Sequence, residues 1–151
     1  SLTIPDGVTS IGDSAFYQCS ALTSVTINSN DILSKTYTST TSLRYVFGSQ
    51  VTQYIIGSNI TSIGERTFYD CSALTSITIP DSVTSIGQRA FYGCSALTSI
   101  TVEATTPPTL SNANAFSSTN NCPIYVPAES VSTYKTASNW STLASRIQAI
   151  P

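Results

Sequence analysis

Hydrophobic and polar positions recur along this chain with a period of about 23 residues, within the range typical of short structural repeats. The clearest unit, Ile79–Ile100, reads IPDSVTSIGQRAFYGCSALTSI. The segments Ile4–Val25 and Ile56–Ile77 superpose on it, with apolar residues at the same places. Ile56 precedes Ile79 by one period, so these units follow one another without a gap. Self-similarity at so short a period predicts a solenoid of stacked repeats.

Within one unit the pattern changes from strand to turn. Leu74–Ile79 ends in alternating, β-branched residues, which predicts a short strand that Pro80 terminates. Val83–Ile86 is a second short extended piece, and it ends at Gly87. Gln88–Tyr92 is expected to form one helical or 3₁₀ turn that leads back toward the next strand. We expect the strands of neighbouring units to pair in parallel, about 4.8 Å apart.

One unit, about residues 28–56, departs from the period because Ile27 and Ile56 are separated by six positions more than one period. The six extra residues are expected in Asn28–Ser42, which is rich in Ser, Thr and Asn and is typical of a loop. Such a loop would form a rim beside the strands. In this unit Tyr45 is expected to take the place that Phe has in the others.

The period is expected to stop after Val102. This predicts two parts, the repeats in 1–102 and a non-repeat cap in 103–151 that covers the end of the solenoid and its strand edge. The expected elements of the cap are an extended bend at Thr105–Thr109, a final strand at Pro123–Val126, and helical pieces at Pro127–Ala137 and Trp140–Ile150.

The recurring motif is a run of Ser-Ile-Gly, then Phe-Tyr, then Cys-Ser-Ala-Leu-Thr-Ser, as in Ser85–Ser99. Over residues 1–102 this motif resembles the BspA-like leucine-rich-repeat family of bacterial cell-surface proteins. The resemblance implies a strand-dominated α/β solenoid with short helical turns. It also implies an extracellular or cell-surface location and a role in binding other proteins or glycans.

Composition excludes several classes of function. Charged residues make up 9% of the chain, against about 25% in an average globular protein. The net charge is −2, and there is no basic run. Nucleic acids and anionic membranes are therefore poor partners, and no apolar stretch is long enough to predict a membrane-embedded protein. The chain has no His, and its acidic residues fall mostly one per unit at turns, so we expect neither enzyme activity nor a cofactor.

Three of the four cysteines, Cys19, Cys71 and Cys94, occupy the same position of the repeat. A metal site or a disulfide is one interpretation, and a ladder of buried thiols that act as small apolar groups is the other. The ladder is favoured because zinc sites use paired Cys or His spacings that this chain lacks. Cys122 belongs to the cap and is expected to be unpaired.

The candidate binding residues are mostly hydroxyl-bearing side chains predicted to point outward from each strand. They would give a flat, uncharged, hydrogen-bonding surface, which the irregular unit interrupts with Gln53 and Ile55. Threonine is also a soluble residue with good β-propensity, so a purely structural role stays open. The candidate residues are Thr23, Thr26, Thr52, Gln53, Thr75, Ser76, Thr78, Thr98, Ser99 and Thr101.

The tyrosines that follow the recurring Phe form a second repeated feature. Tyr17, Tyr69 and Tyr92 would lie beside one another in a stack of coils. They either pack against their neighbours or form an aromatic platform for sugars.

Three functions are compatible with these patterns. The first is a non-enzymatic adhesion module that recognises a protein or glycan of a host or neighbouring cell through its solenoid faces. The second is an architectural spacer that presents another domain, and the third is the binding of a regular surface or crystal by threonine ranks. The chain begins inside a repeat, so further repeats are expected upstream. A monomeric state is also expected.

Overall fold

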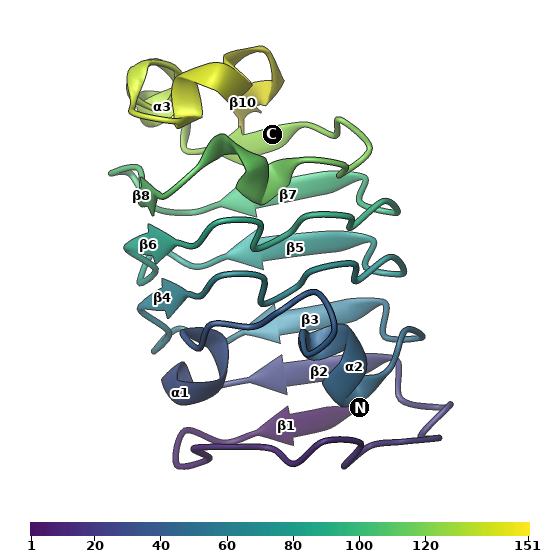
Figure 1. Cartoon of the computed structure of the whole chain (residues 1–151). Coiled ribbons are helices and arrows are strands. Elements are labelled where there is room, and N and C mark those ends of the chain that lie inside the picture. The colour runs from purple at the N-terminus through teal and green to yellow at the C-terminus, as the bar shows by residue number, and fades with distance from the viewer.

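The computed structural model describes residues 1–151 and shows a stack of coils with parallel strands side by side (Figure 1). Seven strands form a large sheet, here called sheet A, in the order β1-β2-β3-β5-β7-β9-β10. Its strands are β1 Leu2–Ile4, β2 Ser24–Ile27, β3 Gln53–Ile56, β5 Ser76–Ile79, β7 Ser99–Val102, β9 Ile124–Val126 and β10 Ile147–Ala149. A smaller sheet B contains β4 Ser62–Ile63, β6 Ser85–Ile86 and β8 Thr109–Leu110. The predicted leucine-rich-repeat solenoid of parallel strands is confirmed.

The strands form where the sequence alternates. In β5 the side chains of Ile77 and Ile79 are buried while those between them face solvent. Their partners across β7 are Ile100 and Val102, so equivalent residues of successive repeats stack directly. The second extended piece is also present, since β6 ends at Ile86 just before Gly87.

The backbones of successive coils touch at the glycine of two of the Ile-Gly pairs. A Cβ atom added at Gly87 would lie 2.5 Å from the backbone nitrogen of Glu65 and 2.6 Å from the carbonyl carbon of Gly64. An added Cβ at Gly64 would likewise collide with the backbone of Ser34 and Lys35. Glycine is required there because the two backbones touch.

The expected helical turn at Gln88–Tyr92 is wrong. The backbone follows separate tight turns, and Arg89 adopts a left-handed φ of 54° that no right-handed helix contains. The backbone of this segment also forms hydrogen bonds to the neighbouring coil: Phe68, for example, donates its N–H to the Ala90 carbonyl oxygen at 2.7 Å. Hydrogen bonds between coils therefore hold the turn side of the solenoid, opposite the strands of sheet A.

The expected polar loop over Asn28–Ser42 is confirmed in part, because residues 34–42 form neither helix nor strand and are mostly exposed. The segment just before them is helical and partly buried, which the sequence did not predict. The rim stays a prediction. Helix α1 spans Asn30–Leu33, and α2 follows at Leu43–Phe47. Ile32 and Leu33 of α1 enter the core. Helix α1 takes the place of a sheet B strand, because Gly64 in the next coil donates its N–H to the Leu33 carbonyl oxygen at 2.7 Å.

The aromatic residue of the irregular coil is also displaced from its expected place. Phe47 is fully buried and packs against Phe16 with ring centroids 5.1 Å apart, whereas Tyr45 is exposed. The expected match of Tyr45 to the recurring Phe is therefore wrong. The helical turn of α2 carries the chain two residues farther before an aromatic side chain points inward.

Residues after Val102 continue both sheets, contrary to the expectation that the repeat stops there. β8 extends sheet B, and β9 and β10 extend sheet A. Ile100 pairs with Ile124, and Ile124 pairs with Ile147, so the spacing of paired strands stays close to that of the repeats. Apolar residues still face inward, and the backbone therefore keeps its period after the motif is lost. The division into 1–102 and 103–151 stays a prediction, and neither sheet breaks at that point.

Short helices close this end of the stack (Figure 1). The helical elements are η1 Ala113–Phe116, η2 Ala128–Ser130, α3 Val131–Thr136 and η3 Trp140–Arg146. The helix expected over Pro127–Ala137 is confirmed as η2 and α3. The helical piece expected over Trp140–Ile150 ends at Arg146, because β10 follows it, so β9 is not the final strand.

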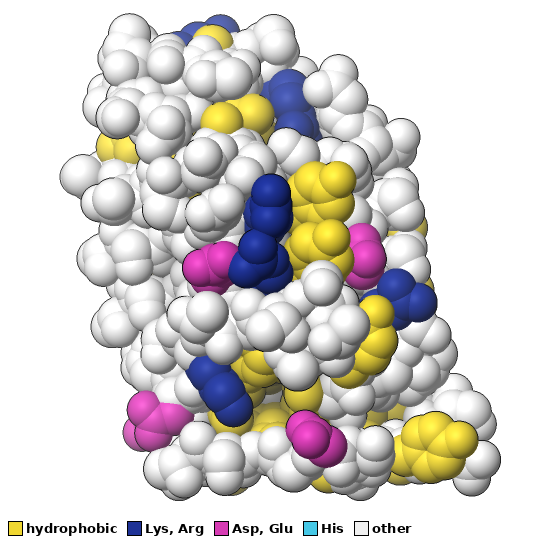
Figure 2. Space-filling view, viewed as in Figure 1, with side chains coloured by type: hydrophobic (Ala, Val, Ile, Leu, Met, Phe, Trp, Pro, Cys, Tyr) yellow, Lys and Arg dark blue, Asp and Glu magenta, His cyan; other side chains and the backbone are white.

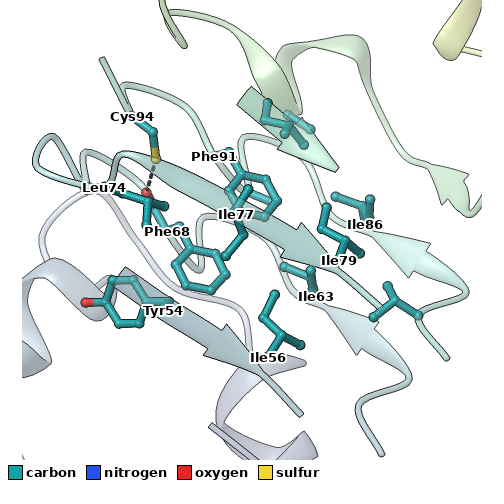
Figure 3. Packing of buried hydrophobic residues seen from close by; sticks show 14 of the residues in the cluster. Tyr54, Ile56, Ile63, Phe68, Leu74, Ile77, Ile79, Ile86, Phe91 and Cys94 are labelled. Carbon is teal, nitrogen blue, oxygen red and sulfur yellow. Dashed lines mark hydrogen bonds between the residues drawn. The ribbon is translucent and has the colours of Figure 1, made fainter. Parts of the chain in front are cut away.

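One continuous core runs through the coils (Figure 3). Phe68 stacks on Phe91 at a centroid distance of 5.0 Å, and Phe91 stacks on Phe116 at 5.5 Å. Trp140 then packs on Phe116 at 5.6 Å, and Tyr134 packs edge-on against Trp140 at 5.1 Å. All the helices are too short for any of them to cross a bilayer.

Candidate interaction surface

The outward face of sheet A brings most of the candidate residues together in two ranks. Strand register places residues of successive strands directly beside one another. The first rank contains Thr3, Thr26, Ile55, Thr78, Thr101, Tyr125 and Gln148. The second rank contains Ser24, Gln53, Ser76 and Ser99. Ser24 donates its hydroxyl hydrogen to the Gln53 side-chain oxygen at 3.0 Å, so the second rank is partly bonded within itself.

The remaining candidates form a separate row just before the strands begin. Thr98 donates its hydroxyl hydrogen to the Thr75 carbonyl oxygen at 3.1 Å. Thr75 and Thr52 do the same to the carbonyl oxygens of Thr52 and Thr23, at 3.4 and 3.3 Å. These hydroxyls bond one coil to the next, which favours a structural role for Thr52, Thr75 and Thr98.

A hollow of about 330 Å³ lies on the outward face where the irregular coil meets its neighbours. Ile55, which interrupts the threonine rank, is 45% exposed and lines this hollow. The other lining residues come from β3 and β5 and from the segments after β3, β5 and β7. They are Gln53, Tyr54, Ile56, Ser58, Ser76, Thr78, Pro80 and Glu103.

Sequence reasoning selected Gln53, Ser76 and Thr78 but left out Ile55 and Glu103. The signal for Ile55 was present, because an isoleucine stands where neighbouring units carry threonine. Nothing in the sequence pointed to Glu103. Its place beside the hollow depends on the pairing of β7 with β5, which brings it near residues far away in the chain.

Charge is distributed unevenly around the solenoid. Five of the eight acidic residues fall among the four residues that follow a sheet A strand, and no Lys or Arg does. These acids are Asp6, Asp31, Asp81, Glu103 and Glu129. This edge of sheet A is therefore uniformly acidic.

The turn side of the solenoid carries charges of both signs beside hydrophobic side chains (Figure 2). Tyr69 and Tyr92 stack there at 5.2 Å and 12°, so each covers one ring face of the other. Tyr17 is 74% exposed and is not part of that stack. Packing between coils therefore accounts for two of the three recurring tyrosines.

The recurring cysteines are free thiols, and the predicted ladder holds for only part of the set. Cys71 and Cys94 are buried, and the Cys94 thiol donates to the Phe68 carbonyl oxygen at 3.1 Å (Figure 3). Cys19 is exposed, because its coil lies at the end of the stack. Burial raises the pKa of Cys71 to about 12, and burial also raises the pKa of Cys94. No group of three or more His, Cys, Asp or Glu side chains is placed to hold a metal ion.

Comparison with known sequences explains this geometry. Six copies of the repeat described as the BspA type leucine rich repeat region match the chain over residues 1–120 and 44–145. The chain belongs to the BspA-type leucine-rich-repeat family. Leucine-rich-repeat proteins are generally non-enzymatic and bind other proteins, and BspA-type members are typically associated with the bacterial surface. No curated protein matches the chain.

A solved structure shows the same architecture. The BspA-type chain resembles the crystal structure of a leucine-rich repeat protein from Bacteroides ovatus ATCC 8483, with 26% sequence identity and a TM-score of 0.62. The match covers 99% of this chain and 36% of the Bacteroides protein. The chain thus spans about a third of the length of that relative.

Proposed function

We propose that this chain is a non-enzymatic adhesion module of a bacterial cell surface that binds a host or neighbouring-cell protein through the outward face of sheet A. The observation that carries the proposal is Ile55, an exposed aliphatic side chain in a rank of hydroxyls beside a hollow. An apolar contact surrounded by hydrogen-bonding groups is the arrangement found at the centre of many protein interfaces.

Support also comes from the low charge of the face. Thr26 pairs with Ile55, and Thr78 pairs with Thr101, so short uncharged side chains surround the isoleucine on the outward face. Short hydroxyl side chains lose little conformational entropy when a partner covers them. A mere spacer has no need for an exposed Ile55 or for the inserted coil that carries it.

The test is a binding screen of the purified chain against extracellular-matrix proteins and a glycan array. Thr78 and Thr101 are both changed to Arg, which places long charged side chains on the face without removing any hydrogen bond between coils. Thr133→Arg on exposed α3 is the matched control. Saturable protein binding that the double variant loses and the control keeps would support the proposal.

Other outcomes identify other functions. Binding only to glycans, lost in the same double variant, would make this face a glycan site. No binding to either class would favour a spacer that presents another domain. Adsorption to a crystalline surface alone would favour recognition by the threonine ranks.

A further inference from the structure

The hollow beside Ile55 combines an apolar side chain with a carboxylate. Ile55 projects from β3, and Glu103 follows directly after β7, two strands away in sheet A. Both line the same hollow, and Pro80 from the segment after β5 adds a second apolar wall. Gln53 and Ser58 contribute further polar groups. The hollow thus offers an apolar surface that leads to a negative charge.

The carboxylate of Glu103 is exposed and has no cation of this chain near it. The single ion pair of the molecule joins Arg66 and Glu65 on the turn side. No Lys or Arg lines the hollow or follows a sheet A strand within four residues, and Asp81 adds a further negative charge along the same edge. The charge that would complement this hollow must therefore come from a partner.

Lysine and arginine side chains match both properties of the hollow. Their methylene stems pack along apolar surface while the charged group extends to a polar environment. A stem lying along Ile55 and Pro80 would bring its cationic end to Glu103. A hydrogen bond between such a cation and a carboxylate is charge-assisted, and it is stronger than one between two neutral groups.

We propose that this hollow receives a lysine or arginine side chain from an extended segment of the partner protein. The inference rests on the proposed function, because it names what part of a protein partner contacts the outward face. An extended segment fits because the hollow runs across β3 and β5 to Glu103, just after β7, and is open to solvent.

The test selects a displayed library of random short peptides against the whole chain and then measures the affinity of enriched peptides. We expect enrichment of Lys or Arg flanked by small or apolar residues. Glu103→Gln should weaken binding by about tenfold, the usual cost of losing one charge-assisted hydrogen bond. Ile55→Thr, which restores the threonine rank, should weaken it as well. Affinity should fall as salt rises.

The matched control is Glu129→Gln, which removes an acid of the same edge that does not line the hollow. Equal losses for Glu103→Gln and Glu129→Gln would overturn the inference, since attraction would then be diffuse. Enriched peptides without a basic residue, or no enrichment at all, would also overturn it. If peptide binding is lost only in the Thr78→Arg and Thr101→Arg double variant, the proposed function is supported and the role of this hollow is contradicted. Silence in the protein screen would instead defeat the proposed function.

Discussion

Two glycines at the same position of successive coils, Gly64 and Gly87, allow the backbones of neighbouring coils to touch. Gly87 leaves no room for a Cβ, whereas an added Cβ at Gly12 meets nothing within 4 Å. We expect Gly87→Ala to lower the free energy of unfolding by about 1–3 kcal/mol, as overpacking usually does. Gly12→Ala should change it little. Chemical denaturation of the two variants checks this, and similar midpoints would contradict the role assigned to Gly87.

Thiol exposure differs between coils that share the same motif. Cys19 is exposed, and Cys71, Cys94 and Cys122 are buried. Because only the thiolate reacts and burial raises the pKa of the three buried thiols, we expect an aromatic disulfide reagent to modify one thiol quickly in the native protein. All four should react after denaturation. Cys19→Ser should abolish the fast reaction, and any fast reaction that survives would contradict the buried ladder.

At this scale the sequence predicted inward and outward residues well in the regular coils. Ile77 and Ile100 are buried as the alternation indicated. The prediction failed for Tyr45 and Phe47. Helical turns in the insertion change the rise of the chain, so residue spacing alone does not show which aromatic residue points inward. Sequence reasoning also noted Ile55 without selecting it, since its exposure depends on the strand register.

Among the elements, η3 is held to the preceding coil by a buried cation. Arg146 donates to the carbonyl oxygens of Cys122 at 2.8 Å and Phe116 at 3.0 Å, and to the Thr119 hydroxyl oxygen at 2.8 Å. No carboxylate pairs with it, so carbonyl groups satisfy its charge. The side chain joins η1, the segment before β9 and η3.

Replacing this arginine tests how much the terminal elements depend on it. Arg146→Met keeps the apolar stem, but it leaves the Cys122 carbonyl without this donor. It also leaves the Phe116 carbonyl with the Thr119 hydroxyl alone. We therefore expect a loss of about 3 kcal/mol in the free energy of unfolding. Lys135→Met on exposed α3 should have little effect. Urea denaturation measures both. An unchanged midpoint for Arg146→Met would show that water replaces its hydrogen bonds without cost.

The inserted coil shows why loops and helices are hard to separate from composition alone. Ser29 accepts a hydrogen bond from the Ile32 N–H and donates its own hydroxyl hydrogen to the Val8 carbonyl oxygen. A residue type that is common in loops therefore caps α1. The short apolar pair Ile32 and Leu33 has no periodic neighbours in the sequence, so its burial became visible only in the fold.

Across the whole molecule, the solenoid continues farther than its motif. The sequence predicted the parallel stack and the closing helix near Tyr134, but it placed the end of the repeat at Val102. Trp140 and Tyr134 extend the aromatic column beyond Phe91 and Phe116. The residues after Val102 differ in type from those of the repeat motif, so the motif did not show that the stack continues. The core requires only apolar side chains of suitable volume that point inward.

Buried thiol and phenol groups make the stability of the whole stack sensitive to alkaline pH. Burial raises the pKa of Tyr54 and Cys94 well above their usual values and that of Cys71 and Tyr37 to about 12. In the unfolded chain these groups have ordinary values near 9 for Cys and 10 for Tyr. Between those limits the unfolded chain releases protons that the folded chain retains, so rising pH favours unfolding.

We therefore expect the free energy of unfolding contributed by these groups to be constant below about pH 8 and to fall as pH rises past 9, more steeply past 10 as the tyrosines join. Thermal unfolding measured from neutral to alkaline pH checks the direction. Cys71→Ala removes one of the titrating thiols, so its curve should fall less steeply between pH 9 and 10 than that of the unsubstituted chain. Parallel curves would mean that Cys71 ionises in the folded protein as readily as in the unfolded chain, which its burial at the centre of the stack opposes.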